Sequence, residues 1–201
     1  MKTHFFLTTL FALTGLSINA QTTFQKIYGG TSNITGYIGQ PTNDGSFIIA
    51  GTTSSFGAGS SDFYLMKTSS EGTLQWTKTF GGTGDEVASS IQQTSDGGFI
   101  LSGYTYGGFG AGVYDAYLVK TSSDGTLQWS KTFGATHNDY GYNVKQTNDG
   151  GYIITGWTDS FSGTLKFYLV RTDFNGSLQW VKTFGGNMGE QATSVFQTSD
   201  G

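Results

Sequence analysis

The sequence predicts an all-β chain assembled from a repeated unit of about 52 residues, and three observations support that prediction. A motif of the form Gly-x-Leu-Gln-Trp-x-Lys-Thr-Phe-Gly occurs three times, with its tryptophans at Trp76, Trp129 and Trp180. The spacings between these tryptophans are 53 and 51 residues, and a period held this closely is the signature of a repeat architecture. The composition agrees, because 32 glycines, 15% aromatic residues and a single proline favour short strands and tight turns over helices.

One period, residues 85–133, shows how each unit is predicted to fold. Strand-length segments alternate with turn signals, and Asp-Gly pairs supply the side-chain capping and the positive φ that tight turns require. The alternating residues of the last strand, from Leu127 through Trp129 to Phe133, are expected on one face. We expect four strands, called a to d in chain order, at residues 86–93, 99–104, 115–120 and 127–133.

The other periods fit the same template, so each unit is predicted to be a four-stranded antiparallel meander. Strand b recurs at residues 47–52 and 152–157, and strand c recurs at residues 62–67 and 166–171. One extra strand is expected near each end of the sequence. A degenerate copy of strand d is expected at residues 24–30, and a strand a with its turn is expected at residues 192–201.

One such meander cannot stand alone, because both of its faces carry large residues. Ordering the backbone costs about 1–2 kcal/mol per residue, whereas full burial of one large side chain returns only roughly 1.5–3 kcal/mol. Each sheet therefore needs a neighbour on either side, which a ring of radially packed blades or a stacked β-solenoid would supply. Hairpins of constant length with Asp-Gly turns favour the ring, a β-propeller of four-stranded antiparallel blades.

The number of units predicts an incomplete arc of about three and a half blades, whereas propellers close with four to eight blades. We expect the sequence to be the N-terminal part of a longer protein, whose last blade would be completed by the early strand d. The predicted boundaries are a signal peptide at residues 1–20 and a repeat segment at 21–201, divided into an outer strand at 24–30, blade 1 at 31–82, blade 2 at 83–135, blade 3 at 136–186 and the start of a fourth blade at 187–201.

The repeat also resembles a known family. The residues that carry the resemblance are Asp-Gly-Gly-(Phe/Tyr)-Ile-x-x-Gly, then Ser-Phe-Gly-Ala-Gly, then Asp-x-Tyr-Leu-x-Lys-Thr, then Gly-x-Leu-x-Trp-x-Lys-Thr-Phe-Gly-Gly. This pattern is similar to that of secreted bacterial and archaeal β-propeller repeat proteins, and it covers residues 24–201. The resemblance implies a secreted or cell-surface protein and no particular activity. The regularity of the repeat, together with the signal peptide and the lack of a unique catalytic set described below, leads us to expect a scaffold for binding, adhesion or structure.

The first twenty residues match a secretory signal peptide. Lys2 gives a positive start, residues 5–16 form a short apolar run, and Ile18-Asn19-Ala20 resembles the small-residue pattern that precedes a cleavage site. About a dozen apolar residues are too few to span a membrane comfortably. We therefore expect export and cleavage before Gln21, a secreted or cell-surface location, and no membrane insertion after cleavage.

Charge narrows the class of partner. The formal net charge is −4 and no cluster of Lys and Arg is present, which argues against nucleic acid, because phosphates require basic patches. The sequence contains no cysteine, so stability must come from packing and hydrogen bonds without disulfides. The partner that we expect is a glycan or a surface protein, and no cofactor is expected.

The longer connections are predicted to share one side of the molecule, where binding residues commonly concentrate. Up-and-down connectivity places the b–c and d–a connections on that side and the short a–b and c–d turns on the other. Aromatic residues at this rim could stack on sugar rings or grip a peptide, or could simply anchor the loops. The binding residues predicted there are Tyr104, Phe109, Asp139, Trp157 and Asp159.

No set of residues identifies a catalytic site or a metal site. Asp85, Glu86 and Asp139 are the candidate carboxylates, but nothing singles out one pair held about 5–10 Å apart, as a glycosidase would need. We expect a non-enzymatic protein without catalytic residues. The alternative is a secreted carbohydrate-active hydrolase whose catalytic residues lie in the loops of this side or in downstream sequence.

Two further repeated positions are expected to be structural. The three tryptophans recur in register, which is typical of packing between blades. The lysines of strand d are expected to pair with acids of the following d–a connection, because buried charges normally need partners. The lysines are Lys26, Lys78, Lys131 and Lys182, and the acids are Asp85, Asp139 and Glu190.

Overall fold

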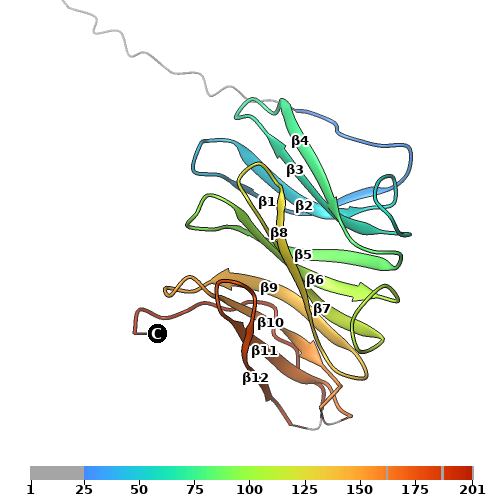
Figure 1. Cartoon of the computed structure of the whole chain (residues 1–201), viewed down its shortest axis with the longest axis vertical. Helices are drawn as coiled ribbons and strands as arrows, with labels where there is room; N and C mark the ends of the chain where they lie inside the picture. The colour runs from blue at the N-terminus through green and yellow to red at the C-terminus, as the bar shows by residue number, and fades with distance from the viewer. Residues whose placement is uncertain (1–24, 162, 187, 201) are drawn as a thin grey trace, which may run out of the picture.

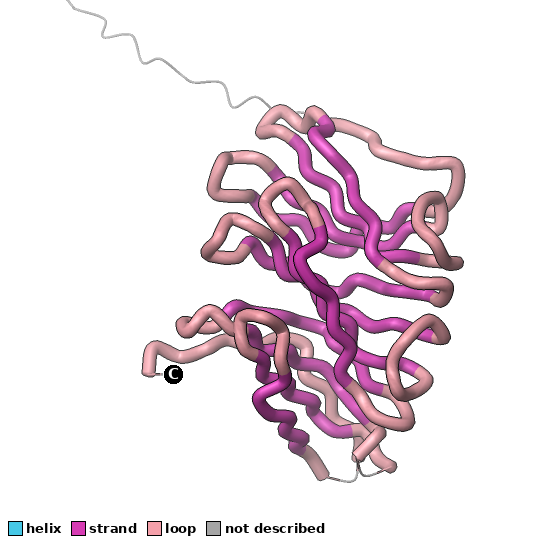
Figure 2. Tube along the Cα trace, viewed as in Figure 1, coloured by secondary structure: helices cyan, strands magenta, loops and turns pink. Residues whose placement is uncertain are grey.

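The computed structural model describes residues 25–161, 163–186 and 188–200, and within them the chain forms twelve strands and no helix (Figures 1 and 2). Nothing in these ranges is therefore a helix that could cross a membrane. The predicted signal peptide lies outside the described residues.

The strands pair in chain order into three antiparallel sheets. Blade 1 contains β1 (Ile34–Pro41), β2 (Phe47–Thr53), β3 (Asp62–Thr68) and β4 (Leu74–Phe80); blade 2 contains β5 (Asp85–Gln93), β6 (Phe99–Tyr106), β7 (Tyr114–Thr121) and β8 (Leu127–Phe133); blade 3 contains β9 (Asp139–Gln146), β10 (Tyr152–Thr158), β11 (Lys166–Thr172) and β12 (Leu178–Phe184).

The tight turns contain the glycines that the sequence predicts. In blade 2, Gly97 of the a–b turn has a φ of 81° and Gly125 of the c–d turn has a φ of 78°. Positive φ is strained for residues with a side chain, so glycine suits both positions. Asp96 caps the first of these turns by accepting a hydrogen bond from the Gly98 N–H at 3.0 Å. The predicted role of the Asp-Gly pairs in setting turn geometry is confirmed.

A β-bulge at the same place in every strand a explains the glycine that recurs in strand b. The pairing registers shift so that Tyr37, Ser89 and Tyr142 are the extra residues in β1, β5 and β9. At each bulge the backbone of strand a presses against strand b. A Cβ at Gly103 of β6 would lie 1.9 Å from the Val87 carbonyl oxygen, and one at Gly156 of β10 would lie 1.7 Å from that of Tyr140. Only glycine fits opposite such a bulge.

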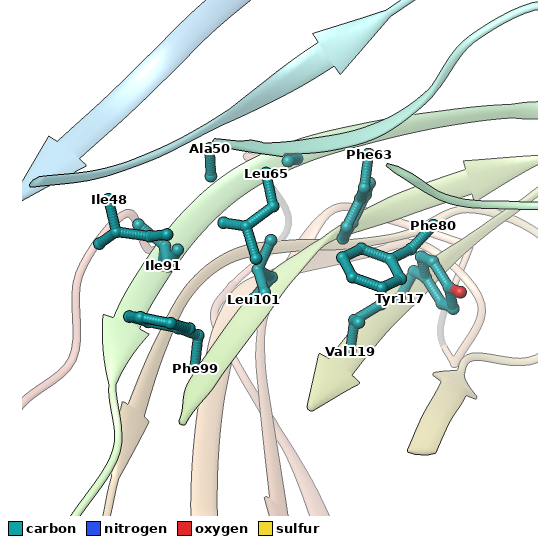
Figure 3. Close-up of a cluster of buried hydrophobic side chains, with 11 residues drawn as sticks. Ile48, Ala50, Phe63, Leu65, Phe80, Ile91, Phe99, Leu101, Tyr117 and Val119 are labelled. Carbon is teal, nitrogen blue, oxygen red and sulfur yellow. The ribbon is translucent and has the colours of Figure 1, made fainter. Parts of the chain in front are cut away.

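The hydrophobic core lies between the blades. One cluster joins blades 1 and 2, where Leu65 of β3 meets Leu101 of β6 and the rings of Phe63 and Tyr117 lie 4.9 Å apart (Figure 3). A second cluster joins blades 2 and 3 and includes Ile100 of β6. Neighbouring residues of β6 thus point to opposite clusters. Blade 2 is covered on both faces, which agrees with the prediction that each sheet needs a neighbour on either side.

The blades stack as in a β-propeller. Successive strands a, namely β1, β5 and β9, contact one another, and the sheets follow one after another along the long axis of the molecule (Figure 1). The fold is all-β, and its three four-stranded antiparallel blades form an open arc of a propeller.

The repeated tryptophans pack between blades where a following blade is present. The rings of Trp76 and Phe99 lie 6.1 Å apart across the first junction, and those of Trp129 and Tyr152 lie 5.7 Å apart across the second. The predicted packing role is confirmed for these two residues. Trp180 stands on the outer face of blade 3 and is 37% exposed.

Neither of the two end segments forms a strand within the described residues. Residues 25–30 belong to no strand, because the strand c of blade 1, β3, already pairs with β4. They run past blade 1, where the Tyr28 hydroxyl donates a hydrogen bond to the Gly72 carbonyl. Residues 188–200 also form no strand. A strand is defined by its ladder, and the described residues offer this segment no strand b with which to pair.

The prediction that Leu127 shares a face with Trp129 is wrong. The register between β7 and β8 shifts after Lys120, which leaves Gln128 as a bulge between the two residues. Leu127 consequently lines a cleft against blade 1 with Phe80, whereas Trp129 faces blade 3.

The predicted pairing of the strand d lysines is also wrong. In the described part of the chain, the ion pairs join the last basic residue of strand c to the aspartate of the a–b turn in the same blade. This turn lies beside the end of strand c because strands b and c are paired neighbours. The N–O distances are 2.6 Å for Lys67 and Asp44, 2.9 Å for Lys120 and Asp96, and 2.6 Å for Arg171 and Asp149.

Candidate functional site

The longer connections do share one side of the molecule. Ser61, in the b–c connection of blade 1, bridges to Asp85 at the start of β5, and Tyr114 bridges to Asn138 at the next junction. The Ser60 hydroxyl also donates a hydrogen bond of 2.7 Å to the Asp85 carboxylate. We call this side the loop face and the side of the Asp-Gly turns the turn face. The two sides appear as the pink segments at opposite ends of the strands (Figure 2).

Aromatic side chains of blades 2 and 3 meet on the loop face and stack one on another. The ring centroids lie 4.8 Å apart for Tyr106 and Tyr114, 4.9 Å for Tyr114 and Tyr140, and 4.4 Å for Tyr140 and Trp157. The interplanar angles of these contacts are 27°, 27° and 19°, so the rings form one continuous stack. We call the whole cluster the aromatic rim: Tyr104, Tyr106, Tyr114, Tyr140, Tyr142 and Trp157.

The strand pairing builds this stack. Tyr106 and Tyr114 are cross-strand partners in β6 and β7, and Tyr140 and Trp157 are cross-strand partners in β9 and β10. Side chains directly opposite in an antiparallel pair approach closely. Blades 2 and 3 therefore supply one stacked pair each, and the two pairs meet across the junction between them. The bulge residue Tyr142 holds the indole of Trp157 in place, since its hydroxyl accepts a hydrogen bond of 2.7 Å from the Trp157 indole N–H.

The rim is accessible and uncharged. Tyr106 is 44% exposed, and the other members are half-buried. Burial raises the pKa of Tyr140, and the neighbouring hydroxyls of Tyr114 and Tyr104 raise it further. Burial likewise raises the pKa of Tyr104. Both phenols therefore remain neutral at physiological pH and present apolar ring faces beside hydroxyl donors.

The predicted binding residues do not all meet at this rim. Tyr104 and Trp157 both contact Tyr140 and belong to the stack. Phe109 lies apart, over the edge of Tyr117 with centroids 4.9 Å apart. Phe56 and Phe161, at the equivalent places in blades 1 and 3, contact the equivalent tyrosines Tyr64 and Tyr168, but as stacked pairs with centroids 6.4 and 6.1 Å apart. A contact repeated in every blade indicates that these phenylalanines anchor their loops.

The two predicted acids also hold loops. Asp139 is fully buried, and its carboxylate accepts hydrogen bonds from the Ala135 N–H at 2.9 Å and the Ser160 hydroxyl at 2.6 Å. Asp159 accepts hydrogen bonds from the backbone and the side chain of Asn138, at 2.8 and 2.9 Å. Both carboxylates thus hold the connections between strands, Asp139 in the interior and Asp159 at a half-buried position.

Pairs of buried carboxylates occur at the blade junctions. Asp62 and Glu86 flank Gly81, where a Cβ would lie 2.3 and 2.1 Å from their oxygens, and Asp115 and Asp139 flank the equivalent glycine of blade 2. Burial raises the pKa of Glu86 and of Asp115. The oxygens of Glu86 accept hydrogen bonds from the Gly82 N–H and the Thr105 hydroxyl. These acids secure the backbone, and no metal-binding group of three or more His, Cys, Asp or Glu side chains occurs within the described ranges.

A groove of about 740 Å³ lies on the turn face between blades 2 and 3. Its walls include Trp129, Tyr152 and Phe174, with the Lys120–Asp96 ion pair at one side. The Lys120 ammonium is buried and donates hydrogen bonds to Asp96, to the Thr121 carbonyl and to Gln128. These partners occupy the Lys120 cation, which therefore holds the a–b turn of blade 2.

Four tyrosines of the rim, Tyr106, Tyr114, Tyr140 and Tyr142, were not among the predicted binding residues, although the repeat contains a signal for Tyr140. Tyr140 stands where the other blades have Val87 and Thr35, as the cross-strand registers show. An aromatic residue that occurs in one blade and not in the others is not needed for the structure of the repeat. Such a residue therefore indicates a binding site better than a residue that recurs in every blade.

The comparisons with known proteins agree with this architecture. Residues 42–74 match the family model described as "Domain of unknown function (DUF5122) beta-propeller". The matched segment runs from the a–b turn of blade 1 to the first residue of β4. The search of curated proteins returned no match.

Proposed function

We propose that this chain is a non-enzymatic binding protein, secreted or held at the cell surface, whose aromatic rim binds a glycan. The observation that carries the proposal is the stack of Tyr106, Tyr114, Tyr140 and Trp157, which spans two blades and remains accessible on the loop face. A rigid scaffold that presents such a surface between blades is a common form of binding site.

The chemistry of the rim suits a sugar ring. The C–H faces of a pyranose pack against aromatic rings, and its hydroxyls can exchange hydrogen bonds with neutral phenols. The tyrosines of the rim supply both features, and the hydrogen bond between Trp157 and Tyr142 fixes the orientation of the indole. A neutral glycan also agrees with the formal net charge of −4, which would not favour an anionic ligand.

Export is part of the proposal and rests on the N-terminal sequence. Residues 1–20 combine a basic start, an apolar run and a small-residue cleavage pattern. A glycan-binding surface has a use outside the cell, where polysaccharides and glycoproteins are exposed. Mass spectrometry of the exported protein should give an N-terminus at Gln21.

The test is a glycan array probed with the full chain, followed by calorimetry on the retained glycans. Replacing Tyr106 or Trp157 by Ala should weaken binding about tenfold or more, equivalent to about 1.4 kcal/mol. Phe56→Ala is the matched control, because Phe56 is a half-exposed aromatic residue on the same face but outside the rim. Retention of no glycan, or equal affinity of the rim variants and the control, would refute the proposal.

A further inference from the structure

The stacking within the aromatic rim leaves few ring faces free for a ligand. Tyr114 and Tyr140 each lie between two stacked neighbours, so both faces of these rings are covered. Tyr106 ends the stack in blade 2, where one face of its ring lies against Tyr114 and the side chain is 44% exposed. A sugar ring that stacks on blade 2 must therefore use the other face of Tyr106.

Asp85 lies on the side of this free face. In the sheet of blade 2, β6 pairs with β7 on one side and with β5 on the other, so that Tyr106 lies between its cross-strand partners Tyr114 and Asp85. Directly opposed side chains of paired strands share one face of the sheet and lie close together. Burial raises the pKa of Tyr104, and the charge of Asp85 raises it further, so the carboxylate lies close enough to act on the rim.

The carboxylate of Asp85 has an oxygen without a partner. The Ser60 hydroxyl donates a hydrogen bond of 2.7 Å to Oδ1, whereas no hydrogen bond or ion pair from the described residues reaches Oδ2. The side chain is half-buried, so the group is both accessible and partly removed from water. Hydrogen bonds to an ionised acceptor are stronger than those between neutral groups, which makes Oδ2 a favourable acceptor for a ligand hydroxyl.

The equivalent place in blade 3 has no such free oxygen. Bridges join Asp85 and Asn138 to the preceding blade in the same way, so Asn138 is the counterpart of Asp85. The Asn138 side chain donates a hydrogen bond of 2.9 Å to the carboxylate of Asp159. In blade 2 the residue at the place of Asp159 is Tyr106, which leaves Asp85 without an equivalent partner. The charge of Asp85 is therefore not needed for the structure of the repeat.

We propose that Asp85 is a binding residue of the aromatic rim, whose carboxylate accepts hydrogen bonds from hydroxyls at the edge of the sugar ring that stacks on Tyr106. This inference rests on the proposed function and specifies the class of ligand. The ligand is a neutral hexopyranose whose hydroxyls beside the stacked face are unsubstituted, because a substituted hydroxyl has no proton to donate to the carboxylate.

Calorimetry on the full chain with neutral hexasaccharides of glucose, mannose and galactose tests the proposal. Asp85→Asn keeps the shape of the side chain and an oxygen for the Ser60 hydroxyl, but it replaces the free acceptor by an amide donor. It should weaken binding of the best hexasaccharide about tenfold or more. Adding Tyr106→Ala should give a combined loss smaller than the sum of the two single losses, because both side chains hold the same sugar ring.

Two controls separate contact with the ligand from other roles of Asp85. Ser60→Ala removes the hydrogen bond that ties Asp85 to blade 1, and Glu71→Gln removes one negative charge from the turn face. Each should leave the affinity unchanged within about twofold. Equal losses for Asp85→Asn and Ser60→Ala would show that Asp85 only holds the loop, and this would overturn the inference.

The remaining outcomes distinguish this inference from the proposed function. Unchanged affinity of Asp85→Asn, together with a loss in Tyr106→Ala, would overturn the role of Asp85 and leave the glycan site at the rim in place. No binding of any of the three hexasaccharides at about 1 mM would overturn the assigned ligand class. If the glycan array also retained nothing, the proposed function would be refuted as well.

Discussion

Single glycines and acids set the local geometry of every blade. The Asp-Gly turns could be predicted from sequence, because their conformation depends only on adjacent residues. The glycine of strand b could be recognised as recurrent, but its reason could not, because the clash at Gly103 involves the Val87 carbonyl on a neighbouring strand. The same holds for Asp139, which was predicted as a binding residue and is buried by a loop from elsewhere in the blade. Interactions between adjacent residues can therefore be predicted from sequence. Contacts between strands can be predicted only once the pairing register of the strands is known.

The buried carboxyl of Glu86 should make stability depend on pH. Burial raises its pKa above the ordinary value of 4.5, and the nearby carboxylates of Asp62 and Asp85 add to the effect. The folded state then holds a proton that the unfolded state has lost, so stability falls as pH rises from about 4.5 through the raised pKa. Glu86→Gln, which keeps the shape, should remove this fall and be more stable than the parent at pH 7.

Urea unfolding from pH 4 to pH 8 measures this effect. The two proteins should be equally stable at pH 4, where Glu86 is protonated in both states. Glu71→Gln is the control, because Glu71 is an exposed acid of a c–d turn and its replacement should give no gain at pH 7. A Glu86→Gln variant that loses stability at every pH would show that the ionised carboxylate stabilises the loop.

At the scale of the element, strand boundaries were the most predictable feature. The four strands of blade 2 lie within two residues of their predicted limits, because Asp-Gly turns and apolar runs delimit them. The faces of those strands were less predictable. A bulge at Gln128 turns Leu127 away from Trp129, and no local pattern marks it. The aromatic rim was found only in part, since Tyr140 joins Tyr104 through the junction of two blades.

Substitution of the strand d tryptophans measures how much the packing between blades contributes to stability. Trp129 lies under Tyr152 and against the Gly176 turn, so Trp129→Ala should lower the free energy of unfolding by roughly 3–5 kcal/mol. Trp180 has the same sequence context but no following blade, and Trp180→Ala should cost less than about 1 kcal/mol. Chemical denaturation of both variants gives the comparison. Equal losses would mean that the tryptophan stabilises its own blade and not the junction.

At the scale of the whole molecule, the repeat period and the need to cover both sheet faces were sufficient to predict a propeller. The end segments lack a ladder for the same physical reason that makes the blades stack. Residues 25–30 and 188–200 carry strand-like sequences, yet they form no strand without paired neighbours. Propensity alone does not create a ladder, and each blade depends on the next for its stability.

This dependence predicts a gradient of local stability along the arc. Blade 2 has a neighbour on each face, and nearly every residue of its β6 and β7 is buried, whereas the residues of β12 are almost all exposed. Opening free energies follow the amount of buried surface that is lost. Hydrogen exchange monitored by mass spectrometry should therefore show protection in β6 and β7 about a hundredfold greater than in β12. A single protection factor across all three blades would mean that the arc opens only as one unit, which would contradict a structure stabilised junction by junction.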